Sequence, residues 1–539
     1  MVREAEKILA RSAGSPATAD TVLVEADRAP EFDDAASVVA PLPRAAIPTW
    51  VWLTGIVVLA TVVRVWQLNA VGFNSDETVY SGQAASIAGH TGLAKFFPIY
   101  RAHPLLFQSI VSVIYRLEVS DFLARLASVA FGLGTVVMTY LLGKLLYGRR
   151  AGLIAAALLA VMPYHVVVTR QVLLDGPMVF FSTLTLYLVA RYALSLQPAW
   201  LFAAAGAMGL TFLSKETGIV LAASVYVFIA LAPKVRARLR ELLIAVAILL
   251  VVMLPFPVAM LFSHRSDTGR QFFVWQILRR PNHGMGFYLS TVPPALGLLV
   301  LAAAVAGLWY LRRERTEKET LLFAWILVPT MFFELWPVKG FQYLLPIAPA
   351  VAVLAARALA RLPVTGHVLL GGVRARARLV TDVLAIVVGL SLLVPTWQRI
   401  TPSDSTAFLA GSGGVVGGRE AGHWVAEHVP EGAQLLSLGP SMANVIQFYG
   451  RRKTFGLSVS SNPLHRNPVY EPVPNPDRML RRGDLQYLVW DSYSAHRSSV
   501  FAEKLLRLAA RYHGRIVHTE WVSIGGHRRS VIVVYEVRP

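Results

Sequence analysis

Apolar segments about 20 residues long recur along most of this sequence and decide what it can fold into. At a rise of about 1.5 Å per residue, about 20 helical residues cross a hydrocarbon layer about 30 Å thick. Only 15% of the residues are charged, against about 25% in soluble domains. The sequence therefore predicts an α-helical polytopic membrane protein with about eleven spans. They begin near Trp50, Asp121, Ala151, Leu173, Trp200, Thr217, Leu242, Thr291, Leu321, Phe341 and Leu379.

Basic residues lie mainly in the short links between these segments. In a soluble protein the formal net charge of +19 would suggest a nucleic-acid partner, but here the positive-inside rule accounts for it, and no nucleic acid is expected. An amino terminus in the cytoplasm puts most basic clusters, such as Arg149 with Arg150, on the cytoplasmic side. A full span at Leu105–Tyr115 would move that pair outside, so this short apolar run is predicted to be a tilted or re-entrant helix.

Composition divides the chain into three parts. Residues 1–48 are polar and are predicted to be a disordered cytoplasmic tail. Residues 49–397 form the transmembrane domain, with a first extracytoplasmic loop at 69–120. Residues 398–539 alternate strand-like and helical runs, which predicts an α/β domain, and the odd number of spans puts it outside. It has no catalytic motif, so acceptor handling and partner binding are both open roles.

The first extracytoplasmic loop carries the most unusual chemistry. Its acidic pair, Asp76–Glu77, lies just beyond the first span, and an amphipathic helix is predicted at Tyr80–Ala88. A carboxylate here can accept a proton from an incoming hydroxyl or amine, or hold a divalent cation. The alternative is a solvated acidic pair at a helix start, where carboxylates suit the helix dipole.

The predicted topology sends nearly all other unusual polar residues to the same outer side, which indicates one active site there. Asp175 is the second candidate catalytic carboxylate, unless it only pairs with an arginine or starts a helix. The basic residues are candidates to bind a lipid phosphate, with snorkelling, solvation or interfacial anchoring as alternatives. The candidate substrate-binding residues are Arg101, His103, Arg125, Arg170, Lys215, Arg279, Arg280, His283, Lys339, Gln342 and Tyr343.

Other kinds of chemistry find little support. The chain has no cysteine, which excludes disulfides, thiolate metal sites and cysteine nucleophiles. It also lacks a P-loop, an HExxH motif and a complete GxGxxG motif. No cofactor is predicted, although a divalent cation shared by Asp76 and Asp175 stays open.

Several motifs in order resemble one known family. They are FNSDETVY, YRAHPLL, RQVLLDGPM, LSKETG and VKGFQYLLPIAPA, all within Trp50 to Ala360. Together they resemble the dolichyl-phosphate-mannose-protein mannosyltransferase and aminoarabinose transferase superfamily, whose members have the GT-C glycosyltransferase fold. The C-terminal part does not resemble the sugar-binding modules of the eukaryotic members, so a bacterial member is expected.

This resemblance implies a function and roles for particular residues. Members take a sugar from a polyprenyl phosphate, invert its anomeric centre and pass it to a glycan, lipid or protein acceptor at the membrane. The catalytic pair of the family maps onto Asp76 and Glu77, and its arginine and aspartate motif onto Arg170 and Asp175. Its second-span arginine maps onto Arg125. His103-Pro104-Leu105 replaces the family's His-Pro-Pro, and the glutamate–lysine variant is absent.

The sequence and the resemblance together predict an extracytoplasmic glycosyltransferase of the plasma membrane with Asp76 as the base. Glu77 and Asp175 are expected to support it. Two alternatives stay open. A transporter or flippase of lipid-linked sugar would carry polar groups near mid-bilayer, and an inactive homologue would bind the lipid-linked sugar without consuming it.

Overall fold

The computed structural model describes residues 48–100, 102–263, 266–278, 281–313, 316–360, 371–401, 415–524 and 527–538. The predicted disordered tail lies almost entirely outside these residues. Three candidate site residues, Arg101, Arg279 and Arg280, also lie outside them.

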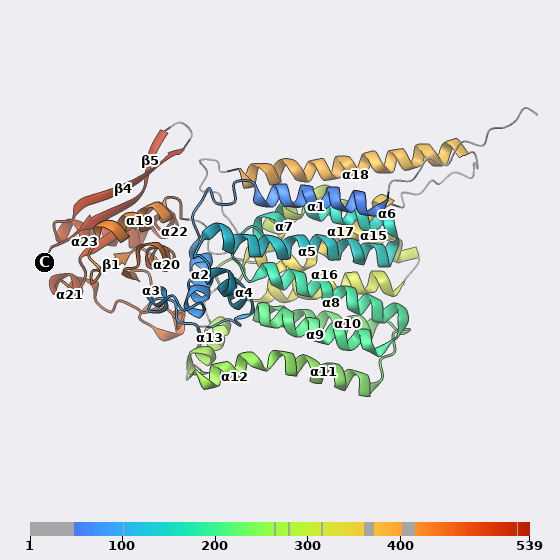
Figure 1. Cartoon of the computed structure of the whole chain (residues 1–539), viewed down its shortest axis with the longest axis horizontal. Helices are drawn as coiled ribbons and strands as arrows, with labels where there is room; N and C mark the ends of the chain where they lie inside the picture. Colours follow the sequence, from blue (N-terminus) through green and yellow to red (C-terminus); the bar gives the residue numbers. More distant parts are fainter. Residues whose placement is uncertain are drawn as a thin grey trace, which may run out of the picture. The chain divides into compact units, whose positions relative to one another are not determined.

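The transmembrane part is a bundle of long, roughly aligned helices (Figure 1). A helix lies at each of the eleven positions where the sequence predicts a span. Some predicted spans consist of two helices, so the helices of this part outnumber the predicted spans. They are α1 (Thr49–Val65), α5 (Asp121–Tyr147), α6 (Arg149–Ala160), α7 (Pro163–Val168), α8 (Asp175–Ser195), α9 (Pro198–Ser214), α10 (Val220–Leu231), α11 (Leu239–Met253), α12 (Pro255–Phe262), α14 (Phe287–Leu296), α15 (Leu298–Arg313), α16 (Glu317–Leu335), α17 (Ala348–Ala360) and α18 (Gly371–Ile400).

In the part of the chain that the structure describes, fewer helices are long and apolar enough to cross a membrane than the eleven spans that the sequence predicts. Within the described residues, five helices are long and apolar enough to cross a membrane, or six if one bent pair counts as a span. That pair is α14 and α15, which meet at 95°. Gly297 at the bend has a φ of 92°, which suits glycine, and Pro293 and Pro294 interrupt the hydrogen bonding of α14. The polytopic helical architecture is confirmed, and eleven spans remain a prediction.

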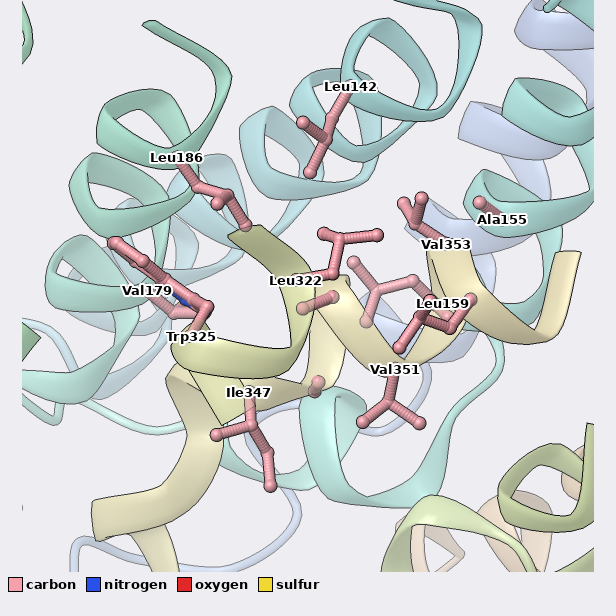
Figure 2. Packing of buried hydrophobic residues seen from close by; sticks show 14 of the residues in the cluster. Leu142, Ala155, Leu159, Val179, Leu186, Leu322, Trp325, Ile347, Val351 and Val353 are labelled. Atoms are coloured by element: carbon pink, nitrogen blue, oxygen red, sulfur yellow. The ribbon is translucent and has the colours of Figure 1, made fainter. Parts of the chain in front are cut away.

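The apolar core of the bundle is packed mainly from aliphatic side chains. Figure 2 shows Leu142, Leu159, Val179 and Leu322 converging with Trp325, all of them buried. Small residues let helices approach closely. A Cβ added to Gly143 of α5 would lie 2.9 Å from the Cα of Gly152 in α6. Such close contacts stabilise helix pairs in a lipid environment.

The first loop, at residues 69–120, is partly helical. It contains α2 (Ser75–Ile87), α3 (Thr91–Ala94) and α4 (Leu106–Tyr115). Helix α2 starts five residues earlier than the predicted Tyr80–Ala88, so the acidic pair lies inside its first turn. Helix α4 has 10 residues, as expected of a short helix in this region. Gly82 of α2 lies against the ring of Phe97, where any Cβ would clash at 2.3 Å.

The segment between the predicted spans at Leu242 and Thr291 also contains a helix, α13 (Ser266–Leu278). Its described residues place Phe272 against the first loop, with ring centroids of Phe272 and His103 5.2 Å apart.

The C-terminal part contains the predicted sheet. Its strand order is β2-β1-β3-β5-β4, with β1 parallel to β2 and β3, and β5 antiparallel to β3 and β4. The strands are β1 (Gln434–Ser437), β2 (Lys453–Gly456), β3 (Tyr487–Asp491), β4 (Arg515–Ile524) and β5 (His527–Glu536). The helices around it are α19 (Gly418–His428), α20 (Pro440–Val445), η3 (Ile446–Gly450), η4 (Pro463–His465), α21 (Pro476–Arg481), α22 (Ser492–Arg497) and α23 (Ser499–Arg511).

The first loop joins this domain to the bundle. Helix α2 packs against α4 and against α20 and η3, while α4 packs against α5 (Figure 1). Asn444 at the end of α20 donates to the Ser75 hydroxyl, 3.0 Å away. The start of α2 is therefore held from both sides.

Candidate active site

A capping box fixes the first turn of α2. The Asn74 side chain accepts hydrogen bonds from the backbone N–H groups of Asp76 and Glu77, each at 3.0 Å. In return, the Glu77 carboxylate accepts from the Asn74 N–H at 3.0 Å. The Asn74 amide also donates to Gln171 at 2.7 Å. This reciprocal arrangement satisfies N–H groups that a helix start otherwise leaves unpaired.

Glu77 and Arg125 form a buried, bidentate ion pair. Arg125 Nε and Nη2 donate to the two carboxylate oxygens, each at 2.8 Å. The other Arg125 donors reach three backbone carbonyls in the segment 68–72, so all five of its N–H groups are used. Glu77 is fully buried and also accepts from the Val172 N–H at 3.0 Å. This geometry does not fit the predicted phosphate binding by Arg125 or direct catalysis by Glu77.

Asp76 faces a different side of α2 and is only half-buried. Its charge raises the pKa of two tyrosines, Tyr80 and Tyr493. Burial raises the pKa of Tyr80 well above its usual range, and the carboxylates of Asp76, Asp175 and Glu216 raise it further. Burial also raises the pKa of Tyr493 in α22, and Asp76 adds to that shift. The Asp76 carboxylate therefore lies within electrostatic reach of both the first loop and the C-terminal domain.

Asp175 and Lys215 form a second buried ion pair. Asp175 begins α8 and Lys215 follows α9, and Lys215 Nζ lies 2.8 Å from each Asp175 oxygen. The ammonium also lies 4.7 Å from the centroid of the Tyr343 ring. The ion-pair alternative for Asp175 named an arginine, whereas the partner is a lysine and Arg170 binds backbone carbonyls instead.

His103 and Glu216 form the third pair. His103 Nδ1 lies 2.9 Å and 3.0 Å from the Glu216 carboxylate oxygens, and the His103 ring packs edge-on to Tyr80 at 5.9 Å. Because Nδ1 is engaged by Glu216, Nε2 is the ring nitrogen that remains for a ligand, and the described residues offer it no hydrogen bond.

Two other predicted phosphate donors close helix ends instead. Arg170 donates to the backbone carbonyls of Val63, Arg64 and Trp66 at 2.9, 3.0 and 2.7 Å, at the end of α1. Lys339 Nζ donates to three carbonyls at the end of α16. Basic side chains suit the carbonyl-rich end of a helix. Neither arrangement fits the expected contact with a lipid phosphate.

The remaining candidates lie near these groups. His283 stacks on Phe287 with centroids 4.1 Å apart. Burial lowers its pKa, and the positive charges of Arg497 and Lys339 lower it further. Gln342 is buried in η2 (Phe341–Ile347), and Tyr343 follows it.

Comparison with known proteins shows which family and which solved structures this chain is similar to. Residues 102–261 match the family model described as dolichyl-phosphate-mannose-protein mannosyltransferase. ArnT from Cupriavidus metallidurans in the apo state is similar in structure, with 18% identity, a TM-score of 0.66, and coverage of 90% of this chain and 98% of ArnT. The chain has the GT-C glycosyltransferase fold. The family resemblance drawn from the motifs is thereby confirmed over residues 102–261.

Other structures agree with this fold. ArnT from the same organism bound to undecaprenyl phosphate gives a TM-score of 0.64 at 18% identity, over 90% of this chain and 98% of ArnT. The oligosaccharyltransferase of Archaeoglobus fulgidus, in complex with Zn and sulfate, gives 0.57 at 15% identity, over 89% of this chain and 73% of that one. No curated protein sequence matches the chain.

The donor set of this site does not suit a cation shared by Asp76 and Asp175. Both Asp175 oxygens contact the Lys215 ammonium, so a divalent cation there would lie beside a positive charge. Across the described residues, no three histidine, aspartate or glutamate side chains gather as metal ligands would.

The sequence interpretation gave no role to three side chains that lie at this candidate site. Tyr80 was placed on a helix but given no role, although it follows Asp76 by one helical turn and so shares its face. Glu216 follows Lys215 in the LSKETG motif, and its polarity between two apolar runs was the available signal. Tyr493 comes from the C-terminal domain, and no local pattern indicates that it approaches Asp76.

Proposed function

We propose that this GT-C glycosyltransferase transfers one sugar from a polyprenyl-phosphate carrier to an acceptor on the extracytoplasmic side of the plasma membrane. The observation that carries the proposal is the grouping around Tyr80 of the Asp76 carboxylate and the pairs Asp175–Lys215 and His103–Glu216. Undecaprenyl phosphate is bound in the ArnT structure, which supports a donor of this chemical class.

The cations of the cluster are suited to hold the donor phosphate. Lys215 contacts both Asp175 oxygens, and its ammonium also faces the Tyr343 ring. His103 offers Nε2, because Glu216 engages Nδ1. Charge-assisted hydrogen bonds from these two groups would stabilise the negative charge on the departing phosphate.

The proposed reaction is a single displacement. Asp76 accepts the proton of the acceptor's nucleophilic hydroxyl or amine as that group attacks the anomeric carbon. The bond between that carbon and the phosphate oxygen breaks, and its electron pair leaves with polyprenyl phosphate. Attack from the side opposite the phosphate inverts the anomeric centre.

The C-terminal domain supplies the acceptor side in this proposal. Its Tyr493 lies within electrostatic reach of Asp76, and Arg497 donates to the Tyr493 hydroxyl at 2.6 Å. The positive charge of Arg497 also lowers the pKa of His283. A hydroxyl-rich acceptor entering between Asp76 and α22 would meet hydrogen-bonding groups from both parts of the chain.

The direct test is consumption of donor. We expect purified protein in proteoliposomes to release polyprenyl phosphate from one member of a panel of polyprenyl-phosphate sugars when an acceptor is present. A transporter would move labelled donor across the bilayer without consuming it. An inactive homologue would bind donor and leave it intact, and either result rejects the proposal.

Sidedness has a separate test. A reporter active only outside the cytoplasm is expected to work when it is fused after Pro539 and to fail when it is inserted after Pro233. The reason is the positive-inside rule, since Lys234, Arg236, Arg238 and Arg240 follow the second site. Activity at Pro233, or silence at Pro539, would reverse the orientation and remove the extracytoplasmic site.

A further inference from the structure

A cavity of about 230 Å³ opens where the C-terminal domain meets the start of α5. The residues of the Asp175–Lys215 and His103–Glu216 pairs do not line it. Its polar wall comes from Asp121 of α5, Arg419 and His423 of α19, and Arg451. Phe448 and Tyr449 of η3 form its aromatic wall. Neither the family resemblance nor the proposed reaction gives this cavity a role.

The backbone that forms the aromatic wall is irregular. Element η3 is a single π-helical turn, a form that occurs often at functional sites. Arg451 directly after it has a φ of 53°, the left-handed conformation that a non-glycine residue rarely adopts. Such conformations persist where the surrounding structure holds them and gather at ligand-binding sites.

The charges in the cavity do not balance. Arg419 is engaged, because it donates to Asn69 at 3.1 Å and approaches Asp121 at 3.5 Å. Asp121 in turn accepts a hydrogen bond from the Tyr449 hydroxyl. The Arg451 guanidinium lies 5.9 Å from the centroid of the Phe448 ring. Among the described residues, this guanidinium has neither a carboxylate partner nor a hydrogen bond. Burial lowers the pKa of its guanidinium, with no acidic neighbour to offset that cost.

We propose that this cavity binds a phosphorylated sugar, either free or as one unit of an anionic glycan. The Arg451 guanidinium is suited to bind the phosphate through two parallel hydrogen bonds. The aromatic wall offers a surface for the sugar ring. The volume is below the roughly 300–1,000 Å³ of sites for drug-sized ligands, so a single sugar unit is the appropriate size.

The cavity also borders the segment that leads into the reaction centre. The Tyr449 hydroxyl accepts a hydrogen bond from the Phe73 N–H at 2.8 Å, and Phe73 immediately precedes the Asn74 cap of α2. Arg419 packs so closely on Gly72 that an added Cβ would lie 2.5 Å from it. A ligand that orders Tyr449 and Arg419 should therefore slow amide hydrogen exchange in residues 69–76.

The test is calorimetric titration of the full chain in detergent with glucose 6-phosphate, glucose and inorganic phosphate. Glucose 6-phosphate is expected to bind most tightly, and Arg451→Gln should weaken it by about tenfold or more, as expected for a lost charged hydrogen bond. The matched control is Arg478→Gln on exposed α21, which should leave binding unchanged. Comparing glucose 6-phosphate with a phosphorylated oligosaccharide then distinguishes a free sugar from a glycan unit.

A second variant separates binding from folding. Arg451→Gly relieves the left-handed backbone, so it is expected to fold at least as well as the wild type while losing glucose 6-phosphate binding. Protection of residues 69–76 from hydrogen exchange should disappear with it. Wild-type affinity in Arg451→Gln, or equal affinity for inorganic phosphate and glucose 6-phosphate, overturns the proposal. Neither measurement depends on glycosyl transfer, so its failure is distinguishable from failure of the proposed function.

Discussion

Asp76→Asn is expected to lower turnover by about 100-fold or more, the lower end of what general base catalysis contributes. The substitution keeps the shape of the side chain but removes the charge and the proton acceptor. Asn is also tolerated near a helix start, so the capping box around Asn74 and Glu77 should persist. Affinity for the lipid-linked donor should change little, because the proposed phosphate contacts come from Lys215 and His103.

The measurement is release of polyprenyl phosphate in proteoliposomes, with donor binding followed separately. Glu118→Gln is a matched control, since Glu118 is an exposed acid in the same loop and its loss should leave turnover unchanged. Consumption of donor by Asp76→Asn at the wild-type rate would show that the first loop is not the reaction centre.

The position of Asp76 could be predicted from the sequence, whereas the different role of Glu77 could not. Both carboxylates belong to one motif and are adjacent in the chain. Successive residues in a helix point about 100° apart, from 3.6 residues per turn. One carboxylate therefore faces the Tyr80 side and the other faces Arg125. Only the early start of α2, at Ser75, reveals this division, and the predicted helix began too late to show it.

The predicted phosphate-binding arginines show a second limit. Arg125 and Arg170 were placed correctly near the outer ends of helices, because hydropathy and charge define those ends. Arg125 binds the Glu77 carboxylate and three backbone carbonyls. Arg170 binds backbone carbonyls as many as 107 positions away in sequence. A basic residue at a membrane surface looks the same in sequence whether it binds a phosphate or closes a helix end. By contrast, Lys215 and Asp175 lie in separate motifs that the predicted topology already put on one side.

The C-terminal domain was predictable in its strands but not in its contacts. The strand-like runs of the sequence are Gln434–Leu438, Leu485–Trp490, Arg515–Val522 and Ser530–Val537, and β1, β3, β4 and β5 lie at these positions. Strand β2 is only four residues long and ends in Gly456, so it leaves too weak a pattern. The contacts of Asn444 and Tyr449 with the segment before Asp76 join residues 369 and 376 positions apart in sequence, and composition does not encode that.

Breaking the Glu77–Arg125 pair is expected to be the most destabilising single change in the first loop. Removing one partner of a buried ion pair leaves an uncompensated charge and costs about 3–5 kcal/mol. Glu77→Gln would leave the Arg125 guanidinium without its counter-ion. Arg125→Met would leave the buried carboxylate facing only the Asn74 and Val172 N–H groups. Unfolding of the detergent-solubilised chain, followed by tryptophan fluorescence, measures the cost, and Arg116→Met at an exposed site is the control.

The double variant decides what the pair is for. Replacing both partners, as Glu77→Gln with Arg125→Met, removes both buried charges and should recover part of the lost stability, because a buried pair is costly to desolvate. Turnover should not recover with it, since methionine at position 125 cannot donate to the 68–72 carbonyls that Arg125 holds in the segment before Asp76. Donor binding through Lys215 and His103 should persist in all three variants. If the double variant regains wild-type turnover together with stability, the pair contributes only to folding, and the position of Asp76 must be set by its contacts with the C-terminal domain instead.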